Sequence, residues 1–101
     1  MGLLKNIFGN RHSDLHEFIG KGAVIVDVRT PDEFNAGHIK GSKNIPLQTL
    51  QNRWEELRDL NKPVITVCQS GMRSGSARSF LEQKGLKVIN GGSWLALNRI
   101  V

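Results

Sequence analysis

The sequence predicts an α/β fold in which a mainly parallel central sheet is flanked by helices on both faces. Short, nearly continuous apolar runs rich in β-branched residues, at 23–28 and 64–67, are typical of buried strands. Apolar residues spaced three or four apart over 47–60 predict an amphipathic helix. Because strand and helix patterns alternate along the chain, we expect parallel strands with helices packed on both faces.

The first half of the chain contains two short helices and two short strands. Ser13 can cap a helix over 14–19, and the strand at 23–28 follows it. Thr30 and Glu33 are spaced as a capping box, so a second helix is expected to begin there and to end before Gly37. A turn and a short strand are predicted over residues 41–46.

The second half repeats the alternation with longer helices. The predicted order is helix 47–60, strand 64–67, helix 74–84, strand 86–89, a turn at 91–93 and a last short helix. A chain of 101 residues is long enough for one core. We therefore divide it into an N-terminal extension, residues 1–12, and a single domain, residues 13–101.

The only cysteine stands where a predicted strand meets a predicted helix. Cys68 follows residues 64–67, and a polar turn with Gly71 then leads to Arg73 and a helical pattern. Ligands of parallel sheets bind at the carboxyl ends of the strands, and such a loop can aim backbone N–H groups at an anion. We interpret Cys68 as a candidate reactive thiolate. A small, inert, buried cysteine is the alternative.

Asp27 and Arg29 lie at the end of the other central strand. Residues two apart on a strand point to the same face, so the carboxylate and the guanidinium can meet. We favour a structural ion pair that braces the loops near the site over direct contact with substrate.

Composition excludes several classes of partner and location. The net charge is +5, but the basic residues are scattered and only six aromatics are present, so nucleic-acid binding is not expected. No run approaches the ~18 apolar residues of a membrane span. Residues 1–9 make a poor signal peptide, and we expect a short turn folded onto the domain. A lone cysteine fits a reducing compartment, which favours a cytoplasmic location.

No metal site or cofactor is predicted. One cysteine rules out an internal disulfide and a cysteine-rich zinc site. His12 and His16 are four apart, but His12 is expected to precede the first helix, and His38 has no neighbouring partner in the sequence.

Several segments together resemble the rhodanese family of sulfurtransferases. The resemblance runs from about residue 13 to the end of the chain, and its order and spacing are more specific than any single piece. The matching segments are Asp27-Val28-Arg29, Glu33-Phe34, Gly37-His38-Ile39-Lys40-Gly41-Ser42, Asn44-Ile45-Pro46, Cys68-Gln69-Ser70-Gly71-Met72-Arg73-Ser74, and Gly85 with Gly91-Gly92.

The resemblance implies a sulfurtransferase that works through a persulfide on Cys68. It implies a small anionic donor, such as thiosulfate, a persulfide or a polysulfide, and a cyanide or thiol acceptor; a protein acceptor stays open. The loop residues Gln69, Ser70, Gly71, Met72, Arg73 and Ser74 would bind the substrate and the persulfide. Arg73 would hold the donor's sulfonate and lower the pKa of Cys68.

Two alternatives stay open at this stage. Some rhodanese-like domains are non-catalytic interaction or regulatory modules, although both Cys68 and Arg73 are present here. Cysteine phosphatases and arsenate reductases use a similar loop, but the phosphatase pattern has one more residue between cysteine and arginine than the four found here. The shorter loop favours a single sulfur atom over a tetrahedral phosphate.

Overall fold

The computed structural model describes residues 11–101 and contains a four-stranded parallel sheet. Its strands are β1 (Val24–Asp27), β2 (Lys43–Asn44), β3 (Val64–Cys68) and β4 (Val88–Ser93), in the order β2-β1-β3-β4. Every neighbouring pair is parallel. The prediction of a short turn folded onto the domain, made for residues 1–9, lies outside the described residues.

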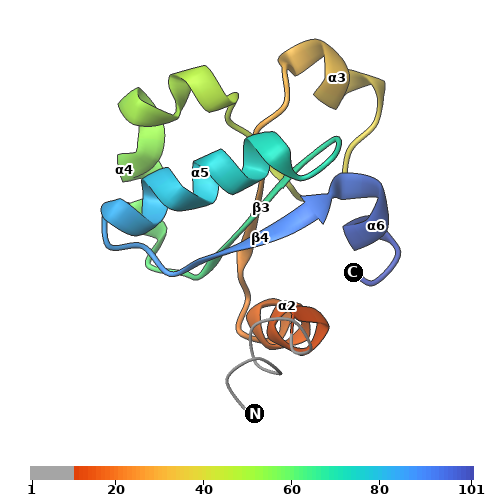
Figure 1. The fold of residues 1–101 in the computed structure, drawn as a ribbon, viewed down its shortest axis with the longest axis horizontal. Coiled ribbons are helices and arrows are strands. Elements are labelled where there is room, and N and C mark those ends of the chain that lie inside the picture. The colour runs from red at the N-terminus through yellow and green to blue at the C-terminus, as the bar shows by residue number, and fades with distance from the viewer. Residues whose placement is uncertain (1–10) are drawn as a thin grey trace.

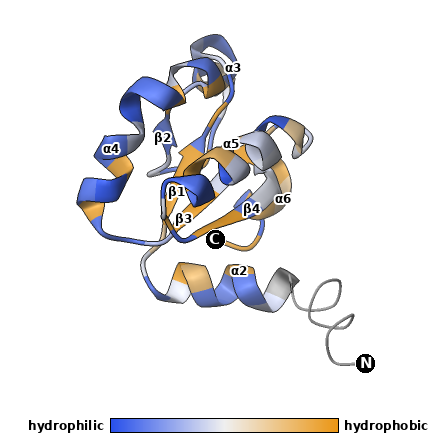
Figure 2. Cartoon of the chain, turned by 60° about the vertical axis from the view of Figure 1, so that its left-hand side comes forward, coloured by the Kyte–Doolittle hydropathy of each residue, from blue (hydrophilic) through white to orange (hydrophobic). Residues whose placement is uncertain are grey.

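Helices cover both faces of the sheet, which confirms the predicted fold class (Figure 1). The helices are α2 (Arg11–Gly20), α3 (Pro31–Ala36), α4 (Leu50–Leu60), α5 (Met72–Gln83) and α6 (Trp94–Asn98), with a 3₁₀ turn η1 at Leu47–Thr49. Leu57 and Leu81, from α4 and α5, belong to one buried cluster, whereas Leu15 and Leu97, from α2 and α6, belong to another. Figure 2 shows the hydrophobic strands between α2 and α5.

All five residues of β3 are buried, because this strand lies between β1 and β4 with helices above and below it. Val64 and Cys68 pack in the cluster of α4 and α5, and Ile65 and Val67 pack in the cluster of α2 and α6. This is the alternation that a pleated strand imposes. It places the Cys68 side chain on the face covered by α5.

Several predicted boundaries were wrong by a few residues. Helix α2 begins at Arg11, so His12 falls inside it and Ser13 is not its cap. The helix predicted over 47–60 begins with η1, and α5 begins at Met72 instead of Ser74. Capping signals mark favourable ends but do not stop a helix from extending through neighbouring polar residues.

The last strand differs most from the prediction. Strand β4 runs from Val88 to Ser93, so Gly91 and Gly92 belong to it and are not a turn. An irregularity opposite Thr66 and Val67 shifts its register against β3. The predicted capping box is confirmed: Glu33 N donates to Thr30 Oγ1 at 3.2 Å, and Thr30 N donates to Glu33 Oε1 at 3.0 Å.

No helix in the part of the chain that the structure describes is long and apolar enough to span a bilayer.

Candidate active site

The Cys68 sulfur lies in a cup formed by the loop between β3 and α5. Gly71 N donates to Cys68 Sγ at 3.0 Å, and Ser74 N donates to it at 3.4 Å. The Ser74 hydroxyl oxygen is also 3.4 Å from the sulfur. Gly71 has φ +101°, and a methyl group there would meet Gly92 Cα at 3.4 Å. A glycine is therefore needed for the loop to curl in this way.

The surroundings of Cys68 favour its thiolate form. Burial raises the pKa of the thiol, but hydrogen bonds from the Ser74 hydroxyl and from the Ser74, Gly71 and Ser70 amides outweigh it, so the pKa is lowered overall. Such hydrogen bonds are stronger to an anion than to a neutral thiol. Of the amides from Gln69 to Arg73 that were expected to face the anion, those of Ser70 and Gly71 contribute, and the Ser74 amide joins them.

The thiol has no exposed surface, with Cys68 at 0%. A reactant can reach the sulfur only when the loop that covers it moves. Of the loop side chains, Gln69 and Ser70 are exposed, and Met72 is 80% exposed.

Arg73 is engaged by a carboxylate from a distant part of the chain. Its Nη1 donates to Glu33 Oε1 at 2.7 Å, and its Nη2 donates to Glu33 Oε2 at 3.0 Å. The hydrogen bond to Glu33 is the main cause that raises the pKa of Arg73, and the charge of Cys68 contributes much less. Hydrogen bonds are the largest contributions that lower the pKa of Cys68, and the attraction between the charges of Arg73 and Cys68 acts in the expected direction.

Asp27 and Arg29 form a buried ion pair. Arg29 Nη2 lies 2.6 Å from Asp27 Oδ2, with side-chain exposures of 3% and 0%. Arg29 also donates to the carbonyl oxygens of Glu33 at 3.3 Å and Gly37 at 2.8 Å, and its guanidinium lies 4.6 Å from the centre of the Trp94 ring. The pair thus joins β1 to the segment around α3 and to α6.

Sequence reasoning missed Asn90, which reaches the cup from β4. Its Oδ1 accepts from the Ser74 hydroxyl at 2.7 Å and from Gly92 N at 2.9 Å, and its Nδ2 donates to Gly71 O at 3.0 Å. No sequence motif identifies this residue as part of the site. Asn90 lies beside the point where the register between β3 and β4 shifts, and a local sequence pattern does not predict such a shift.

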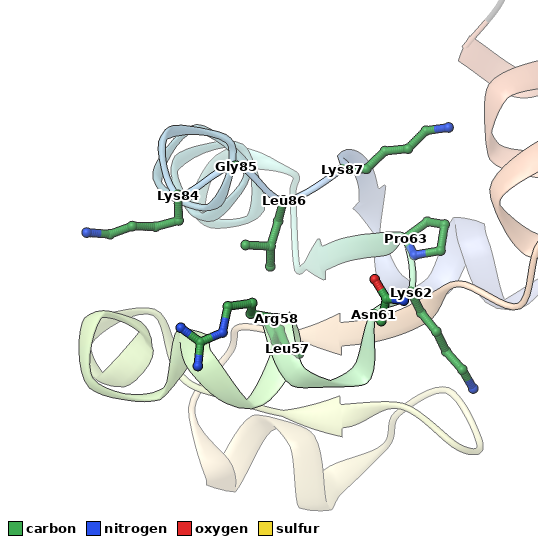
Figure 3. Close-up of a pocket in the computed structure, with 9 residues that line it drawn as sticks. All are labelled: Leu57, Arg58, Asn61, Lys62, Pro63, Lys84, Gly85, Leu86 and Lys87. Atoms are coloured by element: carbon green, nitrogen blue, oxygen red, sulfur yellow. The ribbon is translucent and has the colours of Figure 1, made fainter.

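A cleft of about 360 Å³ lies at the other end of the sheet. Its lining residues are Leu57, Arg58, Asn61, Lys62, Pro63, Lys84, Gly85, Leu86 and Lys87. Figure 3 shows Lys62 and Lys87 pointing away from this cleft, so their charges do not converge in it. Among the residues that the structure describes, no cluster of three or more His, Cys, Asp and Glu side chains could hold a metal ion.

Comparison with known proteins identifies the family. The model of the rhodanese-like domain matches residues 12–94, which is most of the chain and includes the whole cup. The chain belongs to the rhodanese family. A thiosulfate sulfurtransferase, GlpE, of Stutzerimonas stutzeri is 36% identical over 74 residues, covering 73% of this chain and 67% of the relative.

This rhodanese-like domain is also similar to one further curated protein and to two solved structures, and it covers very different shares of their lengths. An uncharacterised Bacillus subtilis protein, YqhL, is 48% identical over 63 residues, which cover 62% of this chain and about half, 49%, of that protein. The reduced CoADR-RHD of Bacillus anthracis superposes with a TM-score of 0.71 and 38% identity, over 85% of this chain and 15% of that one. An E. coli rhodanese with anions gives a TM-score of 0.65 and 32% identity, over 71% and 87%.

Proposed function

We propose that this rhodanese-like domain is a sulfurtransferase that carries one sulfur atom on Cys68. The observation that supports this most strongly is the convergence of the Gly71 and Ser74 amides on the sulfur, which favours an anion there. Both the thiolate and the persulfide are anions, so one cup serves both. We assign the activity to residues 13–101, with residues 1–12 as an extension, in a cytoplasmic setting that keeps a lone thiol reduced.

The proposed cycle consists of two nucleophilic displacements. With thiosulfate, the Cys68 thiolate attacks the outer sulfur; the new S–S bond forms as the bond to the sulfonate sulfur breaks, and sulfite leaves with that electron pair. Cyanide or a thiolate, from a small molecule or a protein, then attacks the outer sulfur of the persulfide. Thiocyanate or a new persulfide leaves, and the thiolate is restored. Charge balances in both steps without an external oxidant.

The other site residues have supporting roles in this proposal. The amides of Ser70, Gly71 and Ser74 hold the sulfur, and Arg73 at the rim of the cup attracts the donor. Asp27 and Arg29 are buried away from solvent, so we assign them to bracing and not to substrate contact.

Intact-mass spectrometry tests the proposal directly. After incubation with thiosulfate, cysteine persulfide or polysulfide, the protein should gain ~32 Da, the mass of one sulfur, on Cys68. Cyanide should remove the added mass, and Cys68→Ser should never acquire it. A wild-type protein that gains no cyanide-labile sulfur from any of these donors would contradict the proposal.

The complete burial of Cys68 favours one second candidate, a non-catalytic interaction module. A covered thiol that never opens to small molecules could not turn over. The same mass measurement separates the two functions, because a binding module would retain its partner in Cys68→Ser and would gain no sulfur.

A further inference from the structure

The Glu33–Arg73 pair joins α3 to the active-site loop. Two parallel hydrogen bonds of 2.7 and 3.0 Å use both oxygens of one carboxylate and both terminal nitrogens of one guanidinium. The two residues are forty positions apart in the sequence. Their side chains are 34% and 37% exposed, so the pair lies at the rim of the cup, where an approaching donor would meet it.

Glu33 is held in place from its other side as well. Its Oε1 accepts from Thr30 N at 3.0 Å and from Thr30 Oγ1 at 3.1 Å, as part of the capping box that begins α3. Arg73 and Thr30 together lower the pKa of Glu33 to about 2. The carboxylate therefore stays charged at any pH at which the thiolate exists, and it cannot swing away without breaking the cap.

Each of the two arginines at this edge of the sheet thus faces its own carboxylate. Arg29 is paired with Asp27, and Arg73 is paired with Glu33. Neither guanidinium offers its full positive charge to an incoming anion. Next to Arg73, the 80% exposed side chain of Met72 offers an apolar surface to the organic part of a donor.

We propose that Glu33 is a specificity-determining residue that sets the charge of the sulfur donor. Its carboxylate offsets the attraction of Arg73 for anions and repels a doubly charged donor such as thiosulfate more than a singly charged organic persulfide. The proposal rests on the sulfurtransferase function proposed above. It makes an organic persulfide, and not thiosulfate, the preferred class of donor.

Glu33→Gln removes this charge with little other change, because Gln also serves as the third helical residue of a capping box. We expect its KM for thiosulfate to fall about three- to tenfold. Its KM for cysteine persulfide, which carries one net negative charge, should fall only about two- to threefold, because the interaction energy is proportional to the charge of the donor. The matched control is Glu82→Gln, which removes the same charge from an exposed pair, Arg78 Nη2 to Glu82 Oε2 at 3.3 Å, far along α5.

A second measurement does not depend on sulfur transfer. The ratio of the alkylation rates of Cys68 by anionic iodoacetate and neutral iodoacetamide reports the local potential, because changes in thiolate population cancel. Because iodoacetate carries only one negative charge, Glu33→Gln should raise this ratio about two- to threefold, and Glu82→Gln should leave it unchanged. Arg73→Gln, a second variant, should lower it, because Glu33 is then unpaired. Melting curves fix a temperature at which every variant is folded.

Two different results would overturn two different statements. An alkylation ratio that is unchanged in Glu33→Gln, or raised equally in Glu82→Gln, would overturn the role of Glu33 even where sulfur transfer is normal. If the wild-type protein accepts sulfur from neither donor, the proposed function fails and the donor specificity fails with it.

Discussion

At the scale of single residues, the site combines a sulfur atom with donors from its own loop. Ser74 contributes twice, through its amide and through its hydroxyl, and it is itself fully buried. The amide is fixed before the charge forms, so it stabilises an anion without the cost of reorganisation. The hydroxyl donates its single proton to Asn90 Oδ1 at 2.7 Å and must turn to donate to the thiolate. The pKa of Cys68 therefore depends on Ser74 more directly than on the arginine at the rim.

Replacing Ser74 with alanine should raise the pKa of Cys68. The hydroxyl hydrogen bond is the first of the contributions that lower this pKa, so its loss shifts the balance toward burial, which raises it. The midpoint of the pH dependence of iodoacetamide alkylation should move to higher pH, and sulfur transfer at low pH should fall with it. Ser79→Ala, at an exposed position of the same helix, is the control. A midpoint that is the same in both variants would contradict this assignment.

Sequence reasoning found the residues of the loop because they are consecutive. Cys68, Gly71 and Ser74 lie within seven positions, so a strand–turn–helix pattern already brings their polar groups together. Glu33 was predicted as a cap, but its second partner was not, because the pairing with Arg73 spans forty residues and depends on how α3 packs beside the loop. Local patterns cannot reveal such a tertiary contact.

At the scale of elements, β4 is where sequence patterns misled most. Two consecutive glycines are typical of a turn, yet here they continue a strand. The reason is space: a methyl group at Gly91 would lie 2.7 Å from Ile65 Cγ2 and 3.0 Å from Thr66 O. Gly91 is therefore a close-packing position between two strands, and the irregular register beside it brings Asn90 to the cup.

We expect Gly91→Ala to destabilise the domain by roughly 1–3 kcal/mol, as overpacking of a close contact does. Urea denaturation followed by circular dichroism measures the change. Gly20→Ala is the control, because a methyl group there meets nothing within 4 Å. Because β4 carries Asn90, the alkylation rate of Cys68 should also change in Gly91→Ala. Equal stability of the two variants would show that the strands separate easily at this point.

At the scale of the whole molecule, the fold gathers the candidate site residues at one end of the sheet. Cys68 and Asp27 are the last residues of β3 and β1, and α3 and the loop before α5 meet above them (Figure 1). The cleft at the opposite end is lined by four cationic side chains: Lys62 and Lys87 point away from it (Figure 3), and Arg58 and Lys84 each lie 5.3 Å from the centre of the Trp54 ring. Alternation of strands and helices was enough to predict this polarity, because parallel strands place all their carboxyl ends at one edge.

The buried Asp27–Arg29 ion pair stabilises the packing at the carboxyl ends of the strands. Arg29 reaches β1, the backbone within α3 at Glu33 and just after it at Gly37, and the Trp94 ring of α6, and it is only 2% exposed. Breaking a buried pair leaves one charge uncompensated, so Asp27→Asn should lower the free energy of unfolding by roughly 3–5 kcal/mol in urea. Glu17→Gln breaks an exposed, solvent-screened pair with Lys21 and should change the free energy of unfolding far less. If the two variants are equally stable, Arg29 is held by its carbonyl and aromatic contacts alone, and the carboxylate of Asp27 must have another purpose at this edge.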